Sequence, residues 1–150
     1  MQARHEKKVN TRLLEDGFEP FLPLEKVLKQ WSQRKKWVDE PLFRSYIFVR
    51  IAAQELMNVV QVPGIVTFVR HAGSPAIIRQ KHIDIIRKLL VSDTTFEVST
   101  KKIELGAEIE IQTGPFRGMK GNVQEFRGNK KLVVHLESID YTIIVGLPSI

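Results

Sequence analysis

The residues best suited to a chemical task are three consecutive cations that lie between two tryptophans. Arg34, Lys35 and Lys36 follow one another, with Trp31 three residues before them and Trp37 directly after. Lys and Arg side chains contact phosphates, and indole rings stack on unpaired bases. The pattern therefore predicts a nucleic-acid contact at a hairpin tip, carried by Arg34, Lys35, Lys36 and Trp37. The alternative interpretation is a solvated, flexible loop.

Other reactive side chains form no recognisable catalytic or metal site. The sequence has no cysteine, and its four histidines, His5, His71, His82 and His135, show no metal-ligand spacing. No glycine-rich phosphate loop precedes a helix, and the segment GPFRG lacks the Lys-Ser/Thr of such a loop. We therefore expect no catalytic residue, no metal ligand and no cofactor, and predict that the protein is not an enzyme.

Basic charge is concentrated in the first part of the chain. Residues 1–90 carry sixteen Lys/Arg and nine Asp/Glu, whereas residues 91–150 carry seven Lys/Arg and eight Asp/Glu. Such asymmetry indicates a polyanionic partner of the first part, either nucleic acid or an acidic protein surface. The alternative is a solvated basic face, and the charge count alone does not separate the two. The apolar runs are far shorter than the roughly 18–20 residues that span a bilayer, so we expect a cytoplasmic protein without a membrane partner.

The elements that must position these residues can be predicted from hydrophobic spacing and turn signals. Apolar spacing and Gly17 predict a first helix with a C-terminal cap, and the β-branched and aromatic segment FRSYIFVRI predicts a buried central strand. The expected elements of the first part are a helix over 4–16, a hairpin over 24–41, a strand over 43–51, a helix over 54–60, a strand over 65–70 and a helix over 79–91. This order describes a mixed α/β domain.

The second part of the chain changes pattern to short strands. Residues 92–102 lose apolar periodicity and predict a linker, which places the first domain at 1–91 and the second at 103–150. Strands are expected over 108–113, 121–126, 131–136 and 141–147, and four or five such strands close into a small barrel to avoid bare edges. Glycines and one proline in 114–128, with many β-branched residues after them, favour this barrel over a helical hairpin.

The turn region of the second part resembles a KOW motif. The residues that carry this resemblance are Gly114, Pro115, Phe116, Gly118 and Gly121, where glycines allow positive φ, the proline presets a turn and Phe116 supplies an aromatic anchor. KOW motifs form the small SH3-like barrel of NusG-type transcription factors and of several ribosomal proteins. The motif alone therefore leaves the ligand open.

Three collinear segments of the first part resemble the N-terminal (NGN) domain of the NusG family. They are ARHEKKVNTRL (3–13), PLFRSYIFVRI (41–51) and VPGIVTFVRHAGSPAII (62–78). The last two look closer to specialised paralogs of the RfaH and UpxY type than to general NusG. The resemblance implies an α+β protein, with an NGN-like antiparallel sheet and flanking helices followed by a KOW barrel. The family's first strand is absent before the opening helix, so either the start is truncated or another segment fills the gap. If the strand is truly absent, exchange of a strand between copies or dimerisation is the expected consequence.

The resemblance also implies which residues meet RNA polymerase. The NGN domain rests a hydrophobic surface on the clamp helices of the largest polymerase subunit, and the matching residues here are Tyr46, Phe48, Phe68, Ile83 and Ile86. Alternation along FRSYIFVRI puts Tyr46 and Phe48 on a face with two arginines, which favours a surface patch with Ile47 and Val49 on the core side. The alternative is that Phe48 and Phe68 are ordinary core residues.

By resemblance, the protein is a transcription elongation or antitermination factor that suppresses pausing or termination on long operons such as capsular polysaccharide loci. Exposed single-stranded non-template DNA is the expected ligand of the cationic hairpin, and ribosomal protein S10 or Rho are expected partners of the KOW domain. The segment ELMN (55–58) departs from the His-Thr stretch through which RfaH-like proteins touch the second-largest subunit. A ribosome-associated RNA-binding protein that uses the KOW barrel is the alternative, and an interaction module without nucleic-acid contact is a further one.

Overall fold

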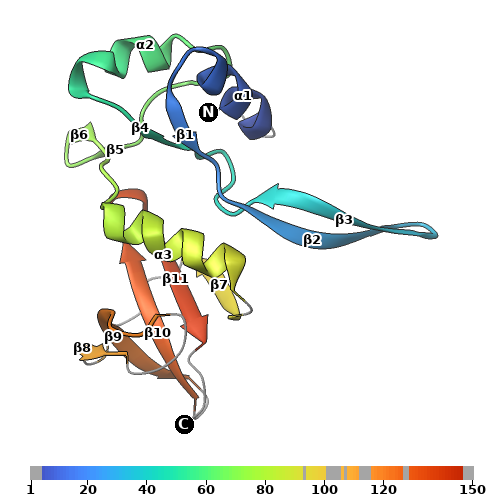
Figure 1. Cartoon of the computed structure of the whole chain (residues 1–150), viewed down its shortest axis with the longest axis vertical. Coiled ribbons are helices and arrows are strands. Elements are labelled where there is room, and N and C mark those ends of the chain that lie inside the picture. The colour runs from blue at the N-terminus through green and yellow to red at the C-terminus, as the bar shows by residue number, and fades with distance from the viewer. Residues whose placement is uncertain are drawn as a thin grey trace. The chain divides into compact units, whose positions relative to one another are not determined.

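The computed structural model describes residues 5–92, 94–100, 106, 108–111, 116–126 and 129–146. The chain divides into two compact units, Met1–Phe68 and Val69–Ile150 (Figure 1). The two units divide before the last helix of the predicted first domain, so the predicted boundary at 92–102 stays a prediction.

Helix α1 (Glu6–Glu15) opens the first unit and matches the helix predicted over 4–16. Its end is a hydrogen-bonded cap: the N–H of Phe18 donates to the carbonyl of Leu13 at 2.9 Å, and the N–H of Gly17 donates to the carbonyl of Leu14 at 3.1 Å. This pair of bonds requires a left-handed residue between them, and Gly17 has φ +83°. The apolar face of α1 buries Val9 and Leu13 completely.

A two-stranded antiparallel sheet follows, formed by β1 (Glu19–Phe21) and β4 (Phe48–Arg50). The predicted strand over 43–51 is therefore wrong in extent: only 48–50 pair, because the chain turns at Ser45, which has φ +67°. The 3₁₀ turn η1 (Ala53–Glu55) and helix α2 (Leu56–Val60) come next, close to the helix predicted over 54–60. Together α1, α2 and one face of the sheet enclose the core of this unit, which consists of Val9, Leu13, Val59 and Val62.

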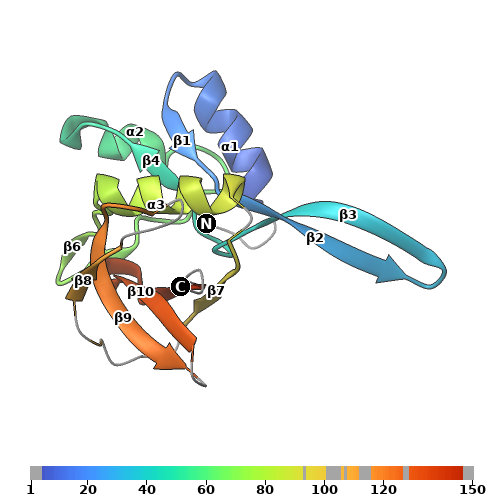
Figure 2. The same ribbon diagram turned by 60° about the horizontal axis from the view of Figure 1, so that its bottom comes forward.

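The hairpin predicted over 24–41 is confirmed. Strand β2 (Leu24–Trp31) pairs with β3 (Arg34–Pro41) along its full length, and Ser32 and Gln33 form the two-residue loop. Among the described residues the hairpin pairs with no third strand. It extends as a long ribbon away from α1 and α2 in both views (Figures 1 and 2).

The second unit begins with the short pairing of β5 (Arg70–His71) and β6 (Ser74–Pro75). The strand predicted over 65–70 is not formed, since only Arg70 of that range lies in a strand. Helix α3 (Gln80–Val91) agrees with the predicted helix over 79–91. Its apolar stripe buries Ile85, Ile86 and Leu89.

A five-stranded antiparallel sheet follows α3 in the second unit, in the order β7-β11-β10-β9-β8. Its strands are β7 (Phe96–Ser99), β8 (Glu108–Glu110), β9 (Lys120–Phe126), β10 (Asn129–Leu136) and β11 (Tyr141–Gly146), with the 3₁₀ turn η2 (Glu137–Ile139) before the last. Four of them match predicted strands, and the β rather than helical state of these residues is confirmed. Strand β7 lies inside the segment predicted as a linker, because residues 96–99 pair with β11.

Candidate nucleic-acid and protein interfaces

The β2–β3 hairpin separates its charges along its length. The distal half, residues 28–37, carries four cations and no carboxylate, whereas all three carboxylates of the hairpin, Glu25, Asp39 and Glu40, lie near its base. Lys29 forms an ion pair with Glu40, and the hydrogen bond from Lys29 lowers the pKa of that carboxyl. The tip is therefore the positively charged end of the hairpin.

The structure brings together the four residues predicted to bind nucleic acid. Arg34, Lys35, Lys36 and Trp37 are consecutive at the start of β3, and all four are exposed. Within the described residues the three cations have no ion-pair partner. Trp31 is 53% exposed and Trp37 is 64% exposed, so both indoles are available to a partner. The contact with nucleic acid itself stays a prediction.

A cluster of aromatic rings lies at the β1–β4 sheet. The ring of Phe48 stacks on that of Phe21 with centroids 6.2 Å apart and meets Phe43 edge-on at 5.7 Å. Phe43 is fully buried, whereas Phe48 and the neighbouring Tyr46 are half-buried. The register explains the first contact, because Phe21 and Phe48 are directly opposite and share a face of the sheet. Rings that are packed on one side and open on the other suit a protein interface.

Sequence reasoning missed Phe21 and Phe43 as members of this cluster. The pairing of Phe21 with Phe48 joins residues that are far apart in the chain. A local pattern does not reveal such a pair, and only the register does.

The other residues predicted to meet polymerase lie in different surroundings. Phe68 is partly buried against the core of the first unit, together with Ile47 and Val49, whose predicted core-side position is confirmed. On α3, Ile83 is half-buried, and Ile86 is completely buried within the second unit. Their roles at polymerase stay predictions, and Tyr46 and Phe48 are the members of the set with the most suitable surroundings.

Of the residues predicted to form a KOW motif, Gly114 and Pro115 lie outside the described residues. Phe116 is 2% exposed, so its ring is buried at this turn. The N–H of Gly118 donates to the carbonyl of Ile111 at 2.8 Å, and the N–H of Met119 donates to the carbonyl of Phe116 at 3.0 Å. These bonds form a tight turn before β9, in which Gly118 has φ +85°. Closure of the sheet into a KOW barrel stays a prediction.

We expect Gly121→Ala to destabilise the second unit by about 1–3 kcal/mol, the usual cost of overpacking a core. A Cβ at this position would lie 2.5 Å from Cδ1 of Leu132, which is completely buried and has little room to move. Gly118→Ala is the matched control: its Cβ would meet open space, so it carries only the cost of positive φ, about 1 kcal/mol. Urea denaturation followed by circular dichroism measures both, and an unchanged midpoint for Gly121→Ala would contradict this packing.

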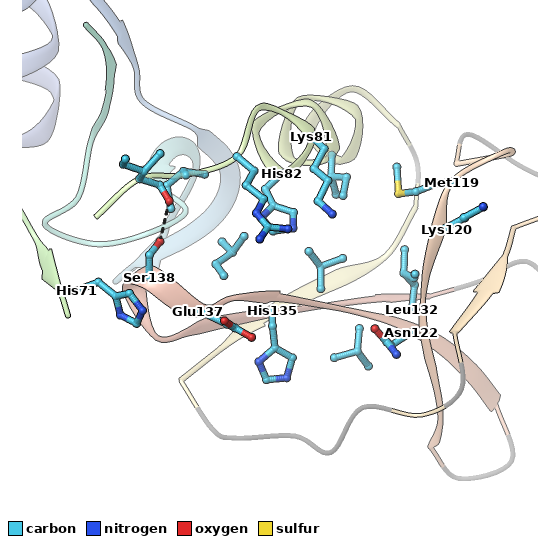
Figure 3. A pocket seen from close by; sticks show the side chains of 18 residues that line it. His71, Lys81, His82, Met119, Lys120, Asn122, Leu132, His135, Glu137 and Ser138 are labelled. Carbon is cyan, nitrogen blue, oxygen red and sulfur yellow. Dashed lines mark hydrogen bonds between the residues drawn. The ribbon is translucent and has the colours of Figure 1, made fainter. Parts of the chain in front are cut away.

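A pocket of about 440 Å³ lies beside α3 in the second unit, lined also by β9, β10 and η2 (Figure 3). One wall is fixed by Ser138, whose Oγ donates to the carbonyl of Ile77 at 3.2 Å. Partial burial lowers the pKa of His82, and the positive charges of Lys81 and Arg79 add to this effect. His82 is therefore mainly neutral at pH 7. Among the described residues no group of three or more His, Asp or Glu is arranged to hold a metal ion.

The helices of the described part are all too short or too polar to cross a membrane.

Comparison with protein families matches residues 1–87 to the family described as "Transcription termination factor nusG". The chain belongs to the NusG family. The match includes α1, both strands of the β1–β4 sheet, the hairpin and most of α3.

Curated NusG relatives cover most of the chain as well. It is 27% identical over 137 residues to the "Transcription termination/antitermination protein NusG" of Staphylococcus carnosus, a match that covers 86% of this chain and 74% of the relative. The NusG proteins of Staphylococcus epidermidis and Staphylococcus aureus are 28% identical over the same length and coverage. The chain is therefore a NusG-like transcription termination/antitermination factor. Proteins of the NusG family are non-enzymatic transcription factors, which confirms the prediction that this one is not an enzyme.

Proposed function

We propose that this NusG-family protein binds RNA polymerase through its first unit and suppresses pausing or termination. The observation that carries the proposal is the aromatic cluster on the β1–β4 sheet, because it lies within the part of the chain that matches the family. Tyr46 and Phe48 offer rigid apolar area at a small cost in side-chain entropy, which is what contact with a helical surface requires. The clamp helices of the largest polymerase subunit are the proposed partner.

The hairpin tip is the proposed contact to exposed non-template DNA. Its support is the set of three exposed cations without ion-pair partners in the described residues, next to two exposed indoles. Phosphate contacts provide affinity without sequence preference, and stacking on indoles favours unpaired bases. A factor held on polymerase by its aromatic cluster would need only this weak, general affinity for DNA.

Neutralising Arg34, Lys35 and Lys36 together by glutamine should leave polymerase affinity nearly intact and weaken binding to single-stranded DNA. The salt dependence of DNA binding should flatten by roughly one unit for each phosphate that the variant no longer neutralises. The matched control removes three other exposed cations, with Lys7, Lys8 and Lys88 each replaced by glutamine. Fluorescence anisotropy at several salt concentrations measures the slope. An equal change in both triple variants would show that only net charge acts.

The finer proposals concern the second unit and the genes served. We propose that the five-stranded sheet is a KOW-type barrel, supported by the turn of Phe116 and Gly118, and that ribosomal protein S10 or Rho binds it. A specialised role of the RfaH or UpxY kind, on long operons such as capsular polysaccharide loci, rests on the resemblance of residues 41–51 and 62–78. The alternative of a ribosome-associated RNA-binding protein rests on the same Phe116 turn.

Co-purification of core RNA polymerase with the full chain tests the proposal and separates it from the alternative. We expect a complex that survives gel filtration and that does not depend on ribosomes. If the chain sediments with ribosomes and leaves polymerase unbound, the alternative holds instead.

A further inference from the structure

The strand register puts the two tryptophans of the hairpin on opposite faces. Trp31 lies directly opposite Arg34, and Trp37 lies directly opposite Leu28. Directly opposite residues of an antiparallel pair share a face, and successive residues along a strand alternate between faces. Trp31 and Trp37 therefore point to different sides, although both lie near the same tip.

The cations divide between the faces in the same way. Arg34 and Lys36 share the face of Trp31, whereas Lys35 shares the face of Trp37. Each face of the tip thus carries one exposed indole and at least one exposed cation. Among the described residues no third strand pairs with either edge of the hairpin, and the exposed indoles and cations show that both faces of its tip are open to a ligand.

Reach and thickness also suit insertion between two strands. Each strand has eight residues, which corresponds to an arm of roughly 26 Å. The arm is a single two-stranded ribbon that extends from the body of the first unit (Figure 2). Positive charge increases toward its tip, because the carboxylates of the hairpin lie near the base. A negatively charged junction is therefore attracted to the end of the arm and not to its root.

We propose that the β2–β3 hairpin is a wedge that enters the fork between two nucleic-acid strands, with one strand on each face. The preferred ligand is a DNA fork, in which a duplex opens into two unpaired arms. One arm stacks on Trp31 and contacts Arg34 and Lys36, and the other stacks on Trp37 and contacts Lys35. The inference deepens the proposed DNA contact and rests on the proposed function for its place on transcribing polymerase. A lone single strand would meet only one face at a time.

Binding of the full chain to three labelled DNA probes tests the wedge. The probes are a fork with two unpaired arms, a single strand of the same total length and a blunt duplex. We expect the fork to bind most tightly, with an affinity about tenfold above that of the single strand. Trp31→Ala and Trp37→Ala should each weaken fork binding roughly 5- to 150-fold, the ratio expected when one base no longer stacks on an aromatic ring. Leu14→Ala, which removes an exposed apolar side chain of α1, should leave the affinities for all three probes unchanged.

Three outcomes would overturn the wedge. Equal affinity for the fork and the single strand would show that DNA binding does not use both faces of the hairpin. Loss of fork binding in one tryptophan variant alone would show that one face carries the contact. A loss of polymerase affinity in Trp37→Ala, with fork binding intact, would assign the face of Leu28 and Trp37 to a protein partner. Polymerase binding is measured separately, so a chain that binds the fork but not polymerase refutes the proposed function and leaves the wedge standing.

Discussion

Phe48→Ala weakens the binding of RNA polymerase by about 1–3 kcal/mol, the usual range for an interface anchor, and Tyr46→Ala has an effect of the same order. In affinity this is roughly a 5- to 150-fold loss. The reason is geometric: Phe48 is held between Phe21 and Phe43 and still keeps part of its surface open to a partner. Titration of labelled full chain with core polymerase measures the loss.

The packing of Phe48 makes a stability control necessary. Truncation of this ring removes its packing against two other rings, so some loss of folding free energy is expected in addition to the weaker binding. Leu14→Ala serves as the binding control, because it removes an apolar side chain that is 58% exposed on α1. If folded Phe48→Ala and Tyr46→Ala bind polymerase as tightly as the unmodified chain, these side chains serve the fold and the proposed interface is wrong.

Leu13→Ala should lower the free energy of unfolding by about 2–5 kcal/mol, the range measured for large apolar side chains cut back to alanine in cores. Leu13 is completely buried in the core of the first unit, against Val9, Val59 and Val62. Its chain neighbour Leu14 is the matched control, since Leu14→Ala removes the same atoms from an exposed site and should cost less than about 0.5 kcal/mol.

Circular dichroism in urea measures both changes, because α1 and α2 of the first unit contribute to the helix signal together with α3 of the second. Tryptophan fluorescence is less suitable: both tryptophans of the chain lie on the exposed hairpin and report on that element alone. Equal costs for the two leucine variants would mean that α1 does not pack with Leu13 inward, and the core of the first unit would have to be reassigned.

The elements foreseen from sequence are those with local signals. Helix α1 is followed by a cap at Gly17 as its pattern indicated, and the hairpin and α3 match their predicted ranges within two residues. The errors concern residues whose state depends on a distant partner. Residues 96–99 had the composition of a linker but pair with β11, and residues 65–69 had the composition of a strand but find no partner strand. Whether such residues form a strand depends on pairing with residues far away in the sequence. Local composition carries no information about that pairing.

The same contrast between local and long-range signals applies to the candidate site. A run of three cations was foreseeable as an exposed surface, because burial of so many unpaired charges is too costly. The opposite directions of Trp31 and Trp37 could not be foreseen from the sequence, because they depend on the two-residue loop at Ser32 and Gln33. A loop one residue longer would shift the register and place both indoles on one face.

A transcription assay on defined templates tests the central proposal most directly. Core polymerase is halted at a known pause or terminator, with and without the full chain, and the lifetime of the pause and the fraction of read-through transcript are measured. The account predicts shorter pauses and more read-through with the full chain, and little change with Phe48→Ala. Unchanged pausing and termination at concentrations where the chain saturates polymerase would contradict it.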